Sequence, residues 1–478
     1  MNQLDSASRL RALLSPSTIA VVGASPDLHI FRGRTLKVML GHPFAGRIYP
    51  VSRSHGEIQG LRAYPTVAAI PEPVDLAILI IPAEFVPDEL ERCGAAGVVA
   101  AMILASGFAE TGGAAGQALQ ARVVAIAERH GMAVCGPNAE GYANTAAALC
   151  PTFSPAVDNL GVPLVPPWRA RGHVAVVAQS GGMGFALFDR GRPRELPFSH
   201  VITTGNEACL EVFEIVDHLL DEGGSDVFLL FLESIKDPRR FERAAARALA
   251  RGVPIIVAKI GKTAAGARAS RSHTGAIAGD HAAYQDMFRR HGILEAADID
   301  DMIDLAAAFS LLGDRLPAGG RVGIGTASGG GGGWLADACV AAGLTVPMLD
   351  AATRAELDRL IPSYGSSQNP VDATAQAIVQ SGYAELGRLI AGSPEIDAVI
   401  LIVSARLATS FEKEREQLAA LARDSRVPIF LWSYTLPSPD TARILSQCGY
   451  PLFTSLQGCA RAVAATAAYR AFCEHAAR

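Results

Sequence analysis

The chain has 478 residues, which is enough for about three domains of roughly 150 residues each. Half of the residues are apolar and 19% are charged, so there is ample material for buried cores and too little charge for a disordered protein. The 42 Lys and Arg against 47 Asp and Glu give a formal charge of −5, which excludes the basic footprint of a nucleic-acid or anionic-membrane binder. We expect a globular protein with neither partner.

The cysteines and the apolar runs indicate where the protein works. The eight cysteines are scattered without a C-x-x-C pair, which is typical of buried thiols in a reducing compartment and predicts neither a metal site nor a disulfide framework. Residues 1–14 lack the continuous apolar core of a secretory signal. The most apolar runs, at 76–81 and 98–104, fall well short of the ~18 apolar residues that a membrane helix needs. We expect a cytoplasmic protein.

Short runs of Val, Ile and Leu alternate with alanine-rich stretches in the first third of the chain. This alternation is typical of β-α-β units whose strands are buried on both faces. It predicts a Rossmann-like domain over residues 1–148. The predicted helices are 85–96 and 116–130, and the predicted strands are 17–22, 47–51, 76–81, 98–104 and 133–135.

Two further series follow a proline-rich stretch that we interpret as a linker over residues 149–171. The second domain is predicted over 172–315, with a closing helix at 299–312 and strands at 173–178, 201–203, 226–232 and 254–260. The third is predicted over 316–478, with strands at 321–326, 398–403, 428–432 and 452–454. The predicted fold class is α/β, with three consecutive doubly wound domains of Rossmann-like or flavodoxin-like type and mainly parallel sheets.

In open parallel sheets, ligands bind at the carboxyl ends of the strands, so the strand-to-helix turns are the places to search. The first turn, Gly23-Ala24-Ser25-Pro26, has the composition of a phosphate-binding turn but lacks the G-x-G-x-x-G spacing of a dinucleotide site. An ordinary tight turn explains it equally well. Similar turns after the other strands of this series favour a nucleotide-like ligand along one sheet edge; they contain Val51, Ile81, Pro82, Ser106, Gly107, Gly136, Pro137 and Asn138.

Two glycine-rich turns open the second and third series. One is Gln179-Ser180-Gly181-Gly182, and the other is Ser328 followed by five glycines, Gly329 to Gly333. Close packing of a helix on a sheet would explain a single such turn. Two at the starts of successive domains favour an anion held between two helix N-termini. The predicted phosphate-binding residues are Ser180, Gly181, Gly182, Gly330, Gly331 and Gly332.

A histidine stands in the small-residue segment 264–279, within Ser272-His273-Thr274-Gly275. The preceding Gly261-Lys262-Thr263 is not a Walker site, because Ile256 occupies the place of the required glycine. A loop histidine is most often a solvated surface residue, but the basic, glycine-rich setting of His273 favours a nucleophile toward phosphate.

Such a nucleophile needs a carboxylate to hold its other ring nitrogen. Glu233, at the end of an apolar run, is the best candidate, and Glu207 competes for the role. Glu233 as a simple cap of the turn before Asp237-Pro238 remains the alternative.

These segments resemble the NDP-forming acyl-CoA synthetases, the superfamily of succinyl-CoA synthetase and ADP-forming acetyl-CoA synthetase. The resemblance runs from about residue 14 to 473, and its most specific part is Ser272-His273-Thr274-Gly275-Ala276, which is similar to the phosphohistidine loop of the family. The other segments that carry it are Val21–Ser25, Gly136–Asn138, Gln179–Gly182, Thr204–Glu207, Leu232–Asp237, Gly329–Gly333 and Asn369–Asp372.

The resemblance implies an enzyme that interconverts acyl-CoA, phosphate and a nucleoside diphosphate with a carboxylic acid, CoA and a nucleoside triphosphate. Acyl phosphate and phosphohistidine are the implied intermediates, His273 the implied nucleophile and Glu233 its orienting residue. The two glycine-rich turns would hold the phosphoryl group. Coenzyme A would be a substrate bound in the first domain, at Gly23, Ala24, Ser25, Val51, Ile81, Pro82, Ser106, Gly107, Gly136, Pro137 and Asn138.

Two departures from the family pattern shape the expectation. Ala139 stands where the family usually has cysteine, which alters a local contact of the CoA site. No stretch is left for the ATP-grasp module that carries Mg-nucleotide, so we expect an α-type subunit that forms a hetero-oligomer with an ATP-grasp β-type subunit.

The alternative function is a CoA-binding regulatory protein that has lost catalysis. The intact His273 loop and Glu233 disfavour it, because a pure binding protein needs no nucleophile. A NAD-dependent dehydrogenase is more distant.

Overall fold

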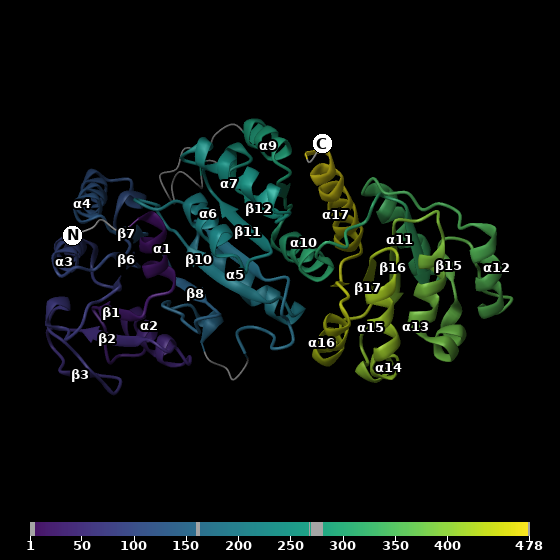
Figure 1. Cartoon of the computed structure of the whole chain (residues 1–478), viewed down its shortest axis with the longest axis horizontal. Coiled ribbons are helices and arrows are strands. Elements are labelled where there is room, and N and C mark those ends of the chain that lie inside the picture. Colours follow the sequence, from purple (N-terminus) through teal and green to yellow (C-terminus); the bar gives the residue numbers. More distant parts are fainter. Residues whose placement is uncertain (1–4, 159–162, 267, 269–280, 477–478) are drawn as a thin grey trace. The chain divides into compact units, whose positions relative to one another are not determined.

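A computed structural model of the chain describes residues 5–158, 163–266, 268 and 281–476 (Figure 1). The chain divides into two compact units. Unit 1 comprises Met1–Val165, His173–Asp189 and Phe198–Glu295, and unit 2 comprises Pro166–Gly172, Arg190–Pro197 and Ala296–Arg478. Across the described residues, no helix is both long and apolar enough to cross a membrane.

The first sheet of unit 1 is fully parallel, in the order β2-β1-β5-β6-β7. Every residue of its inner strands is buried, which explains why they read as continuous apolar runs. The strands are β1 (Thr18–Val22), β2 (Arg47–Val51), β5 (Leu76–Leu79), β6 (Ala100–Ile103) and β7 (Ala133–Cys135), beside the hairpin of β3 (Glu57–Ile58) and β4 (Leu61–Arg62).

Capping residues mark the ends of the helices beside this first sheet. The Asp5 side chain accepts from Ser8 N at the start of the first helix, and Gly131, with φ +63°, ends the fourth. The helices are α1 (Ser6–Leu14), α2 (Phe31–Leu40), α3 (Val86–Ala95) and α4 (Ala114–His130), with short 3-10 turns η1 (Val67–Ala69), η2 (Ala83–Phe85) and η3 (Ala109–Thr111).

The second sheet of unit 1 has the order β13-β12-β11-β9-β10-β8, and all its pairs are parallel except β8 with β10. Its strands are β8 (Tyr142–Asn144), β9 (Val174–Ala178), β10 (Phe198–Thr203), β11 (Val227–Leu232), β12 (Ile255–Lys259) and β13 (Leu294–Glu295). Its helices are α5 (Gly181–Gly191), α6 (Val212–Glu222), α7 (Pro238–Ala250) and α9 (His281–Arg290), and η4 (Pro155–Val157) precedes them.

Strand β8 ties the two sheets together. The hydroxyl of buried Tyr142 donates to Leu13 O (2.7 Å), and the Asn144 amide donates to Leu14 O (3.0 Å), both at the end of α1. One apolar core then runs under both sheets, which makes them a single unit.

Unit 2 contains a third sheet, fully parallel, in the order β15-β14-β16-β17-β18. Its strands are β14 (Val322–Thr326), β15 (Val371–Asp372), β16 (Ala398–Val403), β17 (Ile429–Ser433) and β18 (Leu452–Phe453). Its helices are α10 (Ile299–Leu312), α11 (Gly329–Ala341), α12 (Ala351–Leu360), α13 (Thr374–Gly392), α14 (Ala408–Lys413), α15 (Arg415–Asp424), α16 (Pro439–Cys448) and α17 (Leu456–Ala476), with η5 (Arg192–Arg194).

Helix α10, predicted as the closing helix of the second series, packs against α17 and lies with it in unit 2. All of its residues from Asp301 to Ser310 are buried, so it needs apolar neighbours on every side. Asp301 pairs with Arg461 of α17 (2.7 Å), and the buried Asp304 pairs with Arg194 (2.8 Å). The predicted α/β class with mainly parallel sheets is confirmed. Five strands of two or three residues, β3, β4, β8, β13 and β15, are not predicted, because such short segments carry no periodicity. The equally short β7 and β18 are predicted, at 133–135 and 452–454.

Candidate functional site

A cavity of about 330 Å³ lies at the carboxyl ends of β1, β2 and β5 in unit 1. Gly23 opens the turn after β1 with φ +91°, and a Cβ there would lie 2.5 Å from Ile80 O, so only glycine fits. The cavity brings together six of the residues predicted for CoA, namely Gly23, Ala24, Ser25, Val51, Ile81 and Pro82.

The same cavity is lined by basic side chains that no sequence motif indicated. They are Arg32, Arg53 and Arg92, together with His55. Arg92 and Arg53 both pair with Glu89, at 2.6 and 3.6 Å. Guanidinium groups suit phosphate recognition, and the run Ser52-Arg53-Ser54-His55 directly after β2 was the signal available in the sequence.

The other predicted CoA residues, Ser106, Gly107, Gly136, Pro137 and Asn138, do not line this cavity. The Ser106 hydroxyl donates to Asn138 Oδ1 (2.7 Å), and Asn138 Nδ2 donates to Asn206 Oδ1 (3.2 Å). Asn206 N in turn donates to Pro137 O (2.9 Å). The second group therefore joins the turn after β7 to the turn after β10.

Glu233 follows β11 and is only 4% exposed. Its Oε2 atom is buried and has no hydrogen-bond partner among the residues that the structure describes. A buried carboxylate oxygen without a donor is costly, so this atom is poised to receive one. His273 and its neighbours at 269–280 lie outside the described residues.

Glu207, the competing carboxylate, is also buried, but both of its oxygens are occupied. Oε2 accepts from Gln179 Nε2 (2.8 Å), and Oε1 accepts from Thr204 Oγ1 (3.1 Å) and Val212 N (2.9 Å). Burial raises the pKa of Glu207 to about 7, against the lowering effect of Lys236 and these donors. The arrangement favours Glu233 over Glu207 as the residue that meets a ligand.

The glycine-rich turn before α5 has two kinds of position. A Cβ on Gly181 would lie 2.6 Å from Glu140 Cβ and 3.0 Å from Glu140 Oε2, and one on Gly184 would lie 3.0 Å from Thr203 Cγ2. A Cβ on Gly182 would meet nothing within 4 Å. Gly181 and Gly184 are thus required for packing, whereas Gly182 faces open space where an anion can approach the helix N-terminus.

The turn before α11 repeats this pattern in unit 2. A Cβ on Gly329 would lie 2.8 Å from Asp372 Oδ2, one on Gly332 would lie 3.0 Å from Pro370 Cβ, and one on Gly330 would meet nothing within 4 Å. Ser328, the residue before the helix, makes no side-chain cap. The first N–H groups of α11 therefore lack a side-chain acceptor from the residue that usually supplies it.

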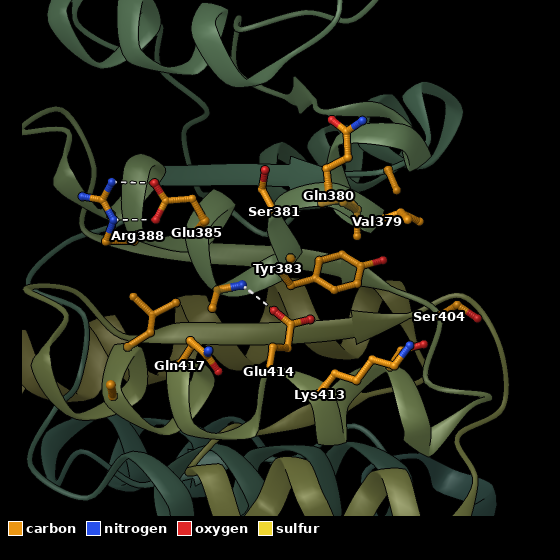
Figure 2. Close-up of a pocket in the computed structure, with 18 of the residues that line it drawn as sticks. Val379, Gln380, Ser381, Tyr383, Glu385, Arg388, Ser404, Lys413, Glu414 and Gln417 are labelled. Carbon is orange, nitrogen blue, oxygen red and sulfur yellow. Dashed lines mark hydrogen bonds and ion pairs between the residues drawn. The ribbon is translucent and has the colours of Figure 1, made fainter.

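Unit 2 also has a cavity of about 1430 Å³ beside α13, α14 and α15, at the carboxyl ends of β16 and β17 (Figure 2). Gly382, with φ +81°, interrupts α13, and Glu414 accepts from Ala384 N (3.0 Å) where the helix resumes. Burial raises the pKa of Glu414. Figure 2 shows Tyr383 and Glu414 in the middle, with the Glu385–Arg388 ion pair toward one end and Lys413 and Ser404 toward the other. No sequence motif indicated this cavity.

Three family models match consecutive parts of the chain. A CoA binding domain matches residues 17–144, a succinyl-CoA ligase like flavodoxin domain matches residues 171–309, and a Ligase-CoA domain matches residues 322–419.

Relatives match the chain over most of its length. The α subunit of acetate–CoA ligase [ADP-forming] II of Pyrococcus furiosus is 35% identical over 388 residues, which are 81% of this chain and 81% of that subunit. Acetate–CoA ligase [ADP-forming] I of Archaeoglobus fulgidus is 32% identical over 96% of this chain. The match covers only 64% of the length of that longer protein.

A solved structure matches closely as well. The dinucleotide forming acetyl-coenzyme A synthetase 1 of Candidatus Korarchaeum cryptofilum, in complex with phosphate and ADP, has a TM-score of 0.84 at 30% identity, over 98% of both chains. This structural match, the three family models and the match to the Pyrococcus furiosus α subunit show that the chain belongs to the family of NDP-forming acyl-CoA synthetases. The chain is of their α type.

Proposed function

We propose that the chain is the α-type subunit of an NDP-forming acyl-CoA synthetase, with His273 as the phosphoryl carrier and Glu233 as its orienting carboxylate. The observation that carries this proposal is the buried Glu233 Oε2 without a hydrogen-bond partner among the described residues. An imidazole N–H is a suitable donor for it, and a carboxylate there favours the positively charged ring of phosphohistidine.

The proposed relay has three reversible steps. A phosphate oxygen attacks the thioester carbonyl, the C–S bond breaks, and acyl phosphate and CoA form. The free ring nitrogen of His273 then attacks phosphorus, the bond from phosphorus to the acyl oxygen breaks, and the carboxylic acid leaves as its anion. Finally an oxygen of the nucleoside diphosphate attacks the phosphohistidine, the P–N bond breaks and a nucleoside triphosphate forms.

Coenzyme A in this proposal occupies the cavity at the end of β1, β2 and β5. Six predicted residues line it, and Arg32, Arg53 and Arg92 supply positive charge for its phosphates. The glycine-rich turns before α5 and α11 bind the transferred phosphoryl group, for which Gly182 and Gly330 leave space.

The nucleotide site belongs, in this proposal, to an ATP-grasp β-type partner that holds Mg-nucleotide. Two supports are the α-subunit name of the Pyrococcus relatives and the 64% coverage of the longer Archaeoglobus protein. The acyl group is a small carboxylate by analogy with the acetate ligases among these relatives.

The experiment is to incubate the purified chain with acetyl-CoA and phosphate, without nucleotide, and to measure released CoA thiol. We expect about one thiol per chain, because phosphohistidine accumulates when no acceptor is present. We expect Glu233→Gln to slow greatly the phosphorylation of His273, followed in parallel with radiolabelled phosphate, because Glu233 acts in the second step. CoA binding without any release would instead support the regulatory, non-catalytic alternative. Steady ATP formation on addition of ADP to the chain alone would overturn the requirement for a partner.

A further inference from the structure

The two residues that follow β11, Glu233 and Ser234, have all their backbone polar groups held by two buried side chains. Gln179 Oε1 accepts from Glu233 N (2.6 Å) and from Ser234 N (3.0 Å), and Gln179 Nε2 donates to Ser234 O (2.9 Å). Lys259 Nζ donates to Glu233 O (2.7 Å). The segment that carries the Glu233 carboxylate is therefore held by side chains from β12 and from the residue after β9.

Glu207 completes this arrangement. The second amide hydrogen of Gln179 goes to Glu207 Oε2 (2.8 Å), so the oxygen of the amide faces two donors and its nitrogen faces two acceptors. A reversed amide would lose all four hydrogen bonds, which determines its orientation. Gln179 is 7% exposed and Glu207 is 5% exposed, so these bonds form away from solvent and are correspondingly strong.

Gln179 also directly precedes the glycine-rich turn Ser180–Gly182. A single residue thus connects the proposed phosphate turn with the segment of the proposed orienting carboxylate. In the matching turn of unit 2, the residue between the strand and the serine is Ala327, whose side chain cannot make such bonds. We call the four hydrogen bonds of the Gln179 amide the clamp. The clamp is present at the turn of unit 1, beside the buried Glu233, and the turn of unit 2 has alanine in its place.

We propose that Gln179 and Glu207 are positioning residues, which hold the Glu233 carboxylate in place against the α5 turn. The inference rests on the proposed function for its effect on catalysis. The hydrogen bonds by which Gln179 fixes the backbone at Glu233 and Ser234 do not depend on that function. A displacement of about 1 Å at a reacting group can cost about a hundredfold in rate.

The decisive variant is Gln179→Met, which keeps the length of the side chain and removes its hydrogen bonds. We expect the rate of His273 phosphorylation by acetyl phosphate to fall at least about tenfold at saturating substrate, with CoA affinity unchanged. We also expect faster hydrogen exchange at the amides of Glu233 and Ser234, which lose their acceptor.

The matched control is Asn144→Leu, because Asn144 is another buried amide of unit 1 whose Nδ2 donates to Leu14 O (3.0 Å) and Ser15 Oγ (3.1 Å), away from this segment. We expect it to lower thermal stability comparably and to leave both the phosphorylation rate and the exchange at residues 233 and 234 unchanged. Equal rate losses in the two variants would show that Gln179 is merely structural and would overturn the proposal.

A rescue experiment separates positioning from general damage. Gln179→Glu alone sets two carboxylates against each other, whereas Gln179→Glu combined with Glu207→Gln restores the bond between them and loses only the bond to Ser234 O. We expect the double variant to phosphorylate at least about tenfold faster than Gln179→Glu. A double variant no faster than the single one would contradict the role of Glu207.

The proposed function and the clamp can fail separately. If the unaltered chain is not phosphorylated at all, the proposed function fails. Unchanged hydrogen exchange at the amides of residues 233 and 234 in Gln179→Met would then decide against the clamp as well.

Discussion

The turns before α5 and α11 have the same construction, with corresponding residues at corresponding positions. In each, a buried strand ends, two residues follow, the second of them a serine, and a helix starts at a glycine. The first glycine lies against a carboxylate, Glu140 for Gly181 and Asp372 for Gly329, and the fourth helical residue, Gly184 or Gly332, packs on the strand end. The second glycine is open in both.

The difference lies in what surrounds each turn. The turn in unit 1 has Gln179 before its serine and is linked through that side chain to Glu207 and Glu233. The turn in unit 2 has Ala327 there, and its Gly329 and Gly330 are exposed. Glycines at the same places therefore shape both turns, which we propose to bind an anion, while the neighbouring side chains determine that, among the described residues, only the turn in unit 1 is linked to Glu207 and Glu233.

The largest effect is expected at the open glycines. Gly182→Ala and Gly330→Ala each place a methyl group where nothing else lies within 4 Å and where phosphate is proposed to approach. We expect phosphorylation of His273 to fall about tenfold to a hundredfold without loss of stability, since alanine favours a helix by about 1 kcal/mol. Gly333→Ala, also open but further along α11, is the control. Unchanged rates in both variants would remove the turns from the phosphate site.

The packed glycines are expected to act through stability. Gly181→Ala puts a Cβ at 2.6 Å from Glu140 Cβ, so the backbone or the Glu140 side chain must shift. We expect the free energy of unfolding of unit 1 to drop by about 1–3 kcal/mol, measured by denaturant titration. A Gly181→Ala protein as stable as Gly182→Ala would show that the two positions do not differ as described.

Glu207 should give unit 1 a stability that depends on pH, because its pKa rises to about 7 on folding from the usual 4.5. The folded state then binds more protons than the unfolded state between these values, so this carboxyl contributes less stability as pH rises from about 4.5 to about 7. Glu207→Gln lacks this dependence. The stability of the wild type relative to the variant should fall by at most about 3 kcal/mol between pH 4.5 and pH 8. A constant difference across that range would contradict the raised pKa.

The smallest effect is expected at Glu140, whose carboxylate lies beside the start of α5 and whose pKa is raised by burial. When ionised it repels an incoming phosphate, so Glu140→Gln should lower the KM for phosphate about three- to tenfold at pH 8, where KM is the phosphate concentration that gives half of the maximal rate of single-turnover CoA release. The gap should close as pH falls and the wild-type carboxyl becomes protonated. An equal KM in both proteins at pH 8 would place Glu140 away from bound phosphate.

Much of the fold follows from the sequence, because the buried parallel strands are continuous apolar runs such as Leu76–Leu79 and Val227–Leu232. The location of β8 and α10 does not follow. Tyr142–Asn144 is too short for a periodic signal, and the apolar pattern of Ile299–Leu312 says that it is buried without saying against which helix.

The candidate site was predictable only where a residue type carries its own chemistry. The turn at Gly23 and the two glycine-rich turns were visible because glycine reports a backbone requirement. Gln179, Glu140 and Arg53 were missed as site residues, because their roles depend on partners distant in the sequence, namely Ser234, Gly181 and Glu89. Arg32 and Arg92 were missed because only the fold brings them to the cavity. The distinction between Glu233 and Glu207 likewise required knowing which carboxylate oxygens already have donors.

The central claim is that His273 carries the phosphoryl group and Glu233 orients it. The most direct measurement is to incubate the chain with acetyl-CoA and radiolabelled phosphate, digest it, and locate the acid-labile, base-stable label by mass spectrometry. The account predicts label on the peptide that contains His273, a greatly slowed label in Glu233→Gln, and none in His273→Ala. Label that persists in His273→Ala, or that forms at an undiminished rate in Glu233→Gln, would contradict it.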